Sequence, residues 1–276
     1  ARTQELKAFG MFANWKNNTK NLCNRNESKI LSSFNKLRTH KQIQTDQKLE
    51  VWCYKRNTVI EDSDFDIRPI EVLSGYVKFP IKVGLEELGS DISIIVFIKE
   101  LWQMVATVGI GIRTNQRYVI AKLGQETVIV AESEAFEVPE LQSLKVIDSK
   151  KVEECICMHP LLNYDIPVIQ LSEVDDQQGI THIAPGHNPD HYIIAQTQSL
   201  PMSSVIDNTG YLNDTTHMFY GLKISEAKKT IEYELAKRNY LVQTSKNTAS
   251  LPYCNISNSS VIYRLVHNWS LDINRS

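Results

Sequence analysis

The chain has 276 residues, 42% of them hydrophobic, which is enough to fill the core of one large domain or two ordinary ones. Its 30 Lys and Arg side chains against 32 Asp and Glu give a net charge of -2, which excludes a globally basic surface of the kind that binds nucleic acid non-specifically. The longest apolar runs, residues 92–98 and 104–112, fall well short of the roughly 20 residues that cross a bilayer as a helix, so we expect no membrane contact.

The first predicted element lies in residues 16–41, the segment with the strongest imbalance of charge in the chain. This segment carries seven Lys and Arg side chains against a single acid. Ser28 is a potential N-cap, after which Ile30, Phe34 and Leu37 fall on one helical face. The pattern is typical of a solvated amphipathic helix, and a patch that faces RNA is the alternative.

From about residue 50 to 200 the pattern changes to short runs rich in β-branched and aromatic residues, separated by Gly, Asn, Asp or Pro. The runs are residues 51–54, 75–79, 92–98, 105–112, 117–123 and 127–130. This spacing favours a barrel or a compact sheet. One helix is expected after it, with Ser225 as N-cap and Ala227, Ile231 and Leu235 on one face. The fold class is therefore predicted as α+β, mainly β.

The segment with the densest chemistry is residues 179–192, GITHIAPGHNPDHY. It holds three of the seven histidines. They are His182, His187 and His191. Imidazoles beside a carboxylate suit zinc, but Pro185 and Pro189 bar the helical i,i+4 spacing that pairs zinc-binding histidines in metalloproteases. A Ser or Cys nucleophile is disfavoured too, because no Gly-x-Ser-x-Gly elbow is present.

Residues 179–192, followed by residues 204–211 (SVIDNTGY), closely resemble the editing domain inserted in bacterial and organellar isoleucyl-tRNA synthetases. Their order and their flanking segments agree with that family over nearly the whole chain. These segments are Pro160, Pro167, residues 9–15 (FGMFANW), residues 76–80 (YVKFP), and residues 261–264 (VIYR) through Trp269. The sister valyl and leucyl enzymes carry Pro-Ala-His where this chain has Ala-Pro-Gly-His.

The resemblance implies a class I synthetase editing-domain fold with a β-barrel-like core and flanking helices. It divides the chain into a lead-in segment with the basic helical region (residues 1–49), the barrel-like core (50–210), and a helix with an exit segment back to a synthetic core outside this sequence (211–276). One methylene is worth only about 1–3 kcal/mol in a binding pocket, a limit for which isoleucine and valine are the standard example. The family therefore hydrolyses valyl-tRNA(Ile) in a second pocket, where a positioned water attacks the aminoacyl ester.

The resemblance also assigns roles and partners. His182 and Asp190 match the family's catalytic positions, whereas Trp102, Thr107, His191 and Glu100 fall at substrate-binding positions. It implies no metal or other cofactor for this domain, while the parent ligase uses ATP and Mg. The implied partners are the 3′ end of tRNA(Ile) and the remainder of the synthetase chain, and DNA is not among them.

Departures from the family pattern lie in the substrate pocket. Where the family has a second Asp that holds the substrate's α-amino group, this chain has His191, and an imidazole is a poor substitute for a carboxylate. Ile98, Lys99 and Glu100 replace three hydroxyl side chains of a Thr-rich strand, and we expect them to fill the pocket or repel its ligand.

These departures predict that hydrolysis is lost or severely weakened, which leaves tRNA positioning and scaffolding as the role of the domain. His182 and Asp190 then remain for catalysis or because their turn needs its polar groups satisfied. The alternative is an active post-transfer editing hydrolase in which His191 or Glu100 has taken over the role of binding the amino group or positioning the water. A free-standing interaction protein that borrowed the fold is more distant.

The five cysteines are too sparse for a disulfide scaffold and indicate a reducing compartment. Related enzymes can carry paired Cys-x-x-Cys zinc knuckles, and this chain has one cysteine of each pair, in Cys53-x-x-Arg56 and Cys254-x-x-Ser257. Tetrahedral zinc needs four ligands, so no zinc is expected.

Two further expectations concern residues 155–157 and localisation. Cys155 and Cys157 are expected to face opposite sides of a strand, one in the core and one on the surface. The bacterial type of motif and the eroded pocket favour the mitochondrial matrix, with the cytoplasm as the alternative.

Overall fold

The computed structural model describes residues 2–15, 23–85, 87, 89, 91–114, 116–171 and 179–273. It divides the chain into two compact units, one of Ala1–Gln47 with His267–Ser276 and one of Lys48–Val266. Within the described ranges, no helix combines the length and the apolar character that crossing a membrane requires.

The smaller unit contains helices α1 (Arg2–Ala8) and α2 (Asn24–Thr39). The predicted helix is confirmed, but it begins after Cys23, whose carbonyl accepts the first helical hydrogen bonds, so Ser28 lies inside the helix and is not its cap. No residue of α2 is buried, although Phe34 meets Trp269 edge to face at 5.6 Å between ring centroids. Part of the basic segment, residues 16–22, lies outside the described residues, and the RNA-facing alternative stays a prediction.

The larger unit is built on a barrel that has six strands among the described residues. Their order is β3-β9-β10-β5-β11-β4, and β3 closes the circuit because it pairs with both β9 and β4. The strands are β3 (Phe65–Val83), β4 (Ile92–Ile98), β5 (Gly109–Arg113), β9 (Ile156–Met158), β10 (Asp165–Leu171) and β11 (Ile180–Ile183). This architecture confirms the predicted mainly β, barrel-like class.

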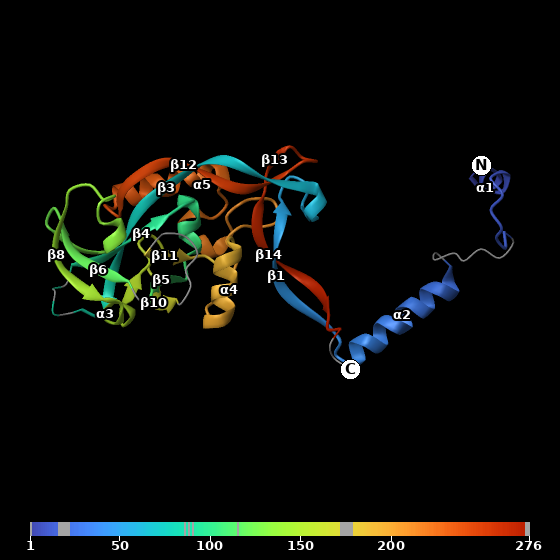
Figure 1. The fold of residues 1–276 in the computed structure, drawn as a ribbon, viewed down its shortest axis with the longest axis horizontal. Coiled ribbons are helices and arrows are strands. Elements are labelled where there is room, and N and C mark those ends of the chain that lie inside the picture. The colour runs from blue at the N-terminus through green and yellow to red at the C-terminus, as the bar shows by residue number, and fades with distance from the viewer. Residues whose placement is uncertain are drawn as a thin grey trace. The chain divides into compact units, whose positions relative to one another are not determined.

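Further strands extend the barrel on both sides (Figure 1). Strands β7 (Glu126–Ala131), β6 (Arg117–Leu123) and β8 (Leu141–Asp148) continue from β4. On the other side β12 (Leu241–Cys254) runs antiparallel along β3, from Leu241 opposite Val77 to Cys254 opposite Phe65, and β13 (Ser259–Ser260) follows it. Because β12 shares this sheet, the compact unit runs on to Val266, past the division at residue 210 that the sequence suggested.

A separate three-stranded sheet has the order β14-β1-β2. Its strands are β1 (Ile43–Cys53), β2 (Thr58–Val59) and β14 (Ile262–Leu271). The remaining elements are short helices and α5: η1 (Asp62–Asp64), η3 (Leu101–Ala106), η4 (Glu132–Glu134), α3 (Ser149–Glu153), α4 (Pro189–Gln198), η5 (Asp214–Phe219) and α5 (Ile224–Lys237).

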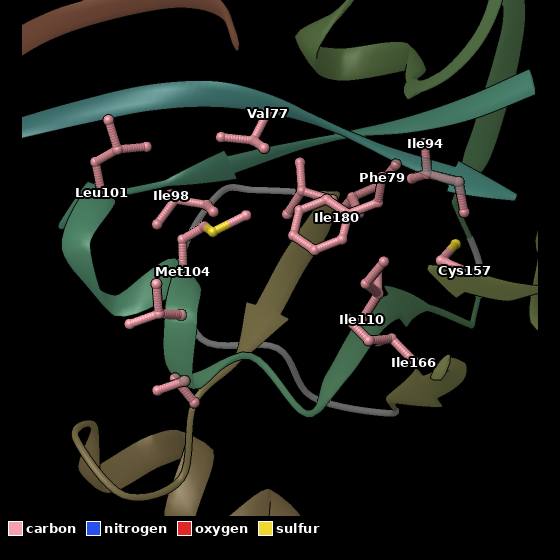
Figure 2. Packing of buried hydrophobic residues seen from close by; sticks show 14 of the residues in the cluster. Val77, Phe79, Ile94, Ile98, Leu101, Met104, Ile110, Cys157, Ile166 and Ile180 are labelled. Carbon is pink, nitrogen blue, oxygen red and sulfur yellow. The ribbon is translucent and has the colours of Figure 1, made fainter. Parts of the chain in front are cut away.

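The main core lies inside the barrel (Figure 2) and also includes the apolar side of α5. Ile94 and Ile98 of β4 belong to this core, whereas Ile95 packs in a second cluster on the other face of the sheet. Successive side chains of a strand point to opposite faces. Full burial of an isoleucine or phenylalanine side chain stabilises the fold by about 1.5–3 kcal/mol. Helix α5 packs its apolar stripe against η3.

Four expectations were wrong in detail. Residues 101–106 form a buried 3₁₀ helix, so only the end of the run 105–112 is a strand, since an apolar run alone does not distinguish a buried strand from a buried helical turn. Helix α5 starts at Ile224 with Lys223 at the N-cap position, two residues before the predicted cap at Ser225. Cys155 and Cys157 are both buried, because residues two apart in an extended chain share a face.

The fourth concerns β structure after residue 200, which the sequence pattern did not show. Strands β12 and β14 both lie in that part of the chain. Their Ser, Thr and Asn residues resemble loop composition, so their pairing comes from the tertiary fold.

Candidate functional site

The histidine-rich segment forms a strand, a loop and a helix. Strand β11 ends at Ile183, a loop follows, and α4 begins at Pro189, the first helical position, where a missing N–H costs nothing. Asn188 caps the helix, since its Oδ1 accepts from the backbone N–H of Asp190 at 2.9 Å and from that of His191 at 3.3 Å. The loop therefore places His182 on a barrel strand and His191 on the first turn of α4.

A cavity of about 300 Å³ lies beside this segment. The end of β4, the strand β11, the loop, α4 and the strands β12 and β14 all contribute to its wall. The lining residues are Phe97, Lys99, Glu100, Gln103, Thr181, His182, His187, Asn188, Pro189, Asp190, His191, Ile194, Ser250, Leu251 and Tyr263. Four of the six predicted site residues, Glu100, His182, Asp190 and His191, thus meet at one cavity.

His187 is held on both ring nitrogens by the backbone. Its Nε2 accepts from the N–H of Val205 at 3.0 Å, so its proton sits on Nδ1, which donates to the carbonyl of Tyr263 at 2.9 Å. The ring also meets Trp102 edge to face at 5.2 Å between centroids. Burial lowers the pKa of His187 to about 4, so the ring is neutral and serves the structure of the loop.

One ring nitrogen of His191 is hydrogen-bonded to the backbone. Its Nδ1 accepts from the N–H of Ala184 at 3.1 Å, which fixes the proton of the neutral ring on Nε2. Burial lowers the pKa of His191 to about 4, so the neutral form prevails at physiological pH. The free edge of His191 therefore donates a hydrogen bond and does not accept one.

His182 stands at right angles to His191, with ring centroids 5.1 Å apart. Its Nδ1 lies 3.2 Å from Oγ1 of Thr107, and either atom can be the donor. Burial, with His191 as a second cause, lowers the pKa of His182 well below its usual value. When Nδ1 is the donor to Thr107, Nε2 of the neutral ring is an acceptor that can position a water molecule or take its proton.

Glu100 is the carboxylate on the inner wall of the cavity. Its Oε1 accepts from Nε1 of Trp102 at 3.1 Å, and its Oε2 accepts from Nε2 of Gln103 at 2.5 Å. Burial raises the pKa of Glu100, while these hydrogen bonds and the charges of Lys228 and Lys99 oppose the shift. Both oxygens are thus engaged within the protein.

The replaced Thr-rich strand does not fill the cavity in the way the sequence suggested. Ile98 is fully buried in the barrel core and is absent from the cavity wall, whereas Lys99 and Glu100 line it. Thr107 is buried and holds His182, and Trp102 lines a smaller neighbouring cavity of about 80 Å³. Lys99 and Glu100 thus place two charged side chains on the wall of a cavity of about 300 Å³.

Asp190 is exposed on the first turn of α4 and lines the outer part of the cavity. Burial raises the pKa of the neighbouring Tyr263, and the negative charge of Asp190 raises it further. The sequence pattern gave no reason to name Tyr263 or Ser250 as site residues, because β14 and β12 reach the cavity only through the fold. Gln103 was not predicted either, although it lies in the segment that resembles the family's Thr-rich, pocket-lining strand.

The described part of the chain contains no cluster of three or more His, Cys, Asp and Glu that could hold a metal ion. Cys53 and Cys254 are both buried and free of disulfides. Burial raises the pKa of Cys254, but hydrogen bonds with Ser257, Ile256 and Cys53 outweigh it and lower the pKa to about 7. The absence of bound zinc stays a prediction.

The fold is that of a CP1 domain of a class I aminoacyl-tRNA synthetase. The solved structure of GlLeuRS-CP1 matches 63% of this chain and 100% of its own chain with a TM-score of 0.51, at 12% sequence identity. No family model matches the chain.

Sequence relatives narrow this class. Isoleucine–tRNA ligases are similar to the chain in Desulforamulus reducens (24% identity over 97% of this chain), Petrotoga mobilis (27% over 99%) and Syntrophomonas wolfei (27% over 98%). The chain is homologous to the editing, or CP1, region of the isoleucyl-tRNA synthetases. It spans about 30% of the length of these curated relatives.

Proposed function

We propose that this chain serves an isoleucyl-tRNA synthetase as an editing-like domain whose hydrolysis of valyl-tRNA(Ile) is lost or severely weakened. In this proposal the parent enzyme joins isoleucine to tRNA(Ile) with ATP and Mg. The domain contacts the 3′ end of the tRNA and supports the remainder of the synthetase chain. Mitochondria are the proposed compartment, on the strength of the bacterial type of motif and the altered pocket.

The observation that carries the proposal is the hydrogen bonding of His191. This residue occupies the position that matches the carboxylate for the substrate's α-amino group. An ammonium group needs an acceptor, but the Nδ1 acceptor of His191 is occupied by the Ala184 N–H, which leaves only the Nε2 donor. Two donors facing each other do not form a hydrogen bond, so the amino group loses its anchor.

The loss of that anchor sets the expected size of the defect. A hydrogen bond between charged groups contributes about 1.5–3 kcal/mol, and each 1.4 kcal/mol of transition-state binding is about tenfold in rate. Hydrolysis of valyl-tRNA(Ile) is therefore expected to be slower than in the relatives by at least about tenfold. His182, supported by Thr107, retains the geometry to orient water, so the defect lies mainly in holding the substrate.

An active hydrolase is the second candidate, and Glu100 is the observation that favours it. Its carboxylate lies on the wall of the same cavity as His182 and can bind an ammonium group if it gives up its contact with Trp102 or Gln103. This candidate predicts that Glu100→Ala abolishes deacylation, whereas the weakened domain has little deacylation to lose.

The experiment is to follow mischarging by the full-length synthetase that contains this region. With valine, ATP and tRNA(Ile), valyl-tRNA is expected to accumulate, whereas the ligase of Petrotoga mobilis serves as a comparison. Failure to accumulate, together with a rise in valyl-tRNA in the Glu100→Ala variant, would replace the proposal with the active hydrolase.

A further inference from the structure

Two hairpin turns in the larger unit bring Cys53 and Cys254 together. Cys53 ends β1 and pairs with Thr58 of β2, and Cys254 ends β12 and pairs with Ser259 of β13. Both thiols are fully buried in a small cluster that also contains Ile60 and Val261. Residues far apart in the sequence thus share one compact environment.

Both sulfurs contact the same residue, Ser257. Sγ of Cys53 lies 3.3 Å from Oγ of Ser257, and the backbone N–H of Ser257 donates to Sγ of Cys254 at 3.3 Å. The Cys53 side chain is among the groups that lower the pKa of Cys254. Ser257 Oγ continues to Ser259 Oγ at 2.9 Å. Hydrogen bonds to Cys254 Sγ stabilise its thiolate, the reactive form of a cysteine.

We propose that Cys53 and Cys254 are a modification site, a pair that hydrogen peroxide converts to a reversible disulfide. The Cys254 thiolate attacks one peroxide oxygen, breaks the O–O bond and becomes a sulfenic acid, and the departing oxygen leaves as water after it takes a proton. Cys53 then attacks the sulfenic sulfur, the S–S bond forms and a second water leaves. The two thiols lose two electrons and two protons, and the peroxide gains them. A dithiol reductant reverses the change by thiol–disulfide exchange.

Access and selectivity both follow from the surroundings. Residues 55–57 and 255–256 of the two turns are exposed and lie beside the thiols, so local opening of the turns suffices for a small oxidant. Cys155 and Cys157 are buried elsewhere, in the main core, and the Cys155 thiol donates to the carbonyl of Lys151. The bond between Cys53 and Cys254 would join the β1–β2 turn to the β12–β13 turn and so restrain β12, which lines the cavity.

The test is peptide mapping by mass spectrometry of the 276-residue chain. The chain is treated with a chelator, exposed to hydrogen peroxide and alkylated without reduction. The expected result is one peptide pair joined through Cys53 and Cys254, lighter than the sum of its parts by two hydrogen atoms, with Cys155 and Cys157 alkylated after denaturation. A dithiol should remove the link.

Variants complete the test. Cys254→Ser and Cys53→Ser should each abolish the link, whereas Cys157→Ser is the matched control that should keep it. The melting temperature of the unsubstituted chain should rise on oxidation, and that of Cys53→Ser should not. Oxidation of Cys23 without any Cys53–Cys254 peptide, or links only between other cysteines, would overturn the proposal, and because the mapping uses the unsubstituted chain, this outcome does not depend on how the variants fold.

Discussion

The buried histidines differ in how many of their ring nitrogens the protein itself uses. His159 and His187 have both nitrogens hydrogen-bonded to the backbone, so they support the loops that surround them. His182 and His191 each have one nitrogen held by Thr107 or Ala184, and both rings line the cavity. A histidine-rich motif thus contains structural and site histidines side by side.

His187→Ala should destabilise the larger unit by about 2–4 kcal/mol, because it leaves the N–H of Val205 and the carbonyl of Tyr263 without their partner in a buried place. Urea unfolding at pH 7.5 would measure this change. His267→Ala is the control, since its single hydrogen bond to Gln47 is exposed, and it should cost less than about 0.5 kcal/mol. Equal effects of the two substitutions would refute the structural role of His187.

At the scale of elements, the N-terminus of α4 determines where His191 points. Asn188→Ala removes the acceptor for two backbone N–H groups and should cost about 1 kcal/mol. Asn188→Asp keeps an acceptor and should cost much less. Urea unfolding of both variants checks the difference, and a larger loss in the Asp variant would argue against the cap.

The close approach at Gly186 gives a second prediction for this loop. A Cβ there would lie 2.0 Å from the carbonyl oxygen of Ser203, a backbone atom that cannot move alone. Gly186→Ala should therefore destabilise the unit by about 2 kcal/mol or more. Gly221→Ala, at a position with a positive φ but no atom within 4 Å of the new Cβ, should cost only about 1 kcal/mol. Thermal melts of both variants would contradict this account if Gly186→Ala were the milder change.

The elements that sequence predicted well are those whose own residues favour them. The bounds of β4 and β6 match the predicted runs, because β-branched residues fill both strands. Strand β12 was missed because its alternation of polar residues resembles a loop, and its long pairing with β3 provides its stability. The start of α4 was missed because a proline at the first helical position looks like an interruption when the cap is not recognised.

The site was predictable only in part, because some of its residues reach the cavity only through tertiary pairing of strands. The motif supplied His182, Asp190 and His191, and the structure places all three around one cavity with Glu100. Tyr263 could not be predicted, since no local pattern shows that β14 begins at this cavity. The burial of Ile98 in the core was equally hidden, because in a strand the side that faces the core depends on the register of its neighbours.

At the scale of the whole molecule, buried ionisable groups predict how stability depends on pH. Burial lowers the pKa of His159, His187 and His191 to about 4 and holds that of His182 well below its usual value. The unfolded chain therefore binds more protons than the folded chain between about pH 6.5 and 4, and stability falls as the pH falls through that window. Burial also raises the pKa of Glu134 to about 7, which acts in the opposite direction and partly offsets the loss.

The free energy of unfolding should fall by about 1–3 kcal/mol for each unit that the pH is lowered between pH 6.5 and 5. The four histidines with lowered pKa outweigh the carboxyl groups with raised pKa. Urea unfolding at pH 7.5, 6.5 and 5.5 measures it. Glu134→Gln removes the opposing group and should steepen the decline. A stability that rises on acidification would show that the histidines are not buried in their neutral form.

The most direct test of the proposed loss of hydrolysis is single-turnover deacylation of valyl-tRNA(Ile) by the 276-residue chain. We expect a rate close to the spontaneous one. His191→Asp alone should give little rescue, because Lys99 and Glu100 remain on the cavity wall. The corresponding region of the Petrotoga mobilis ligase is the comparison and should be faster by at least about tenfold. Clearance by the unsubstituted chain well above the spontaneous rate, abolished by His191→Ala or Glu100→Ala, would contradict the account.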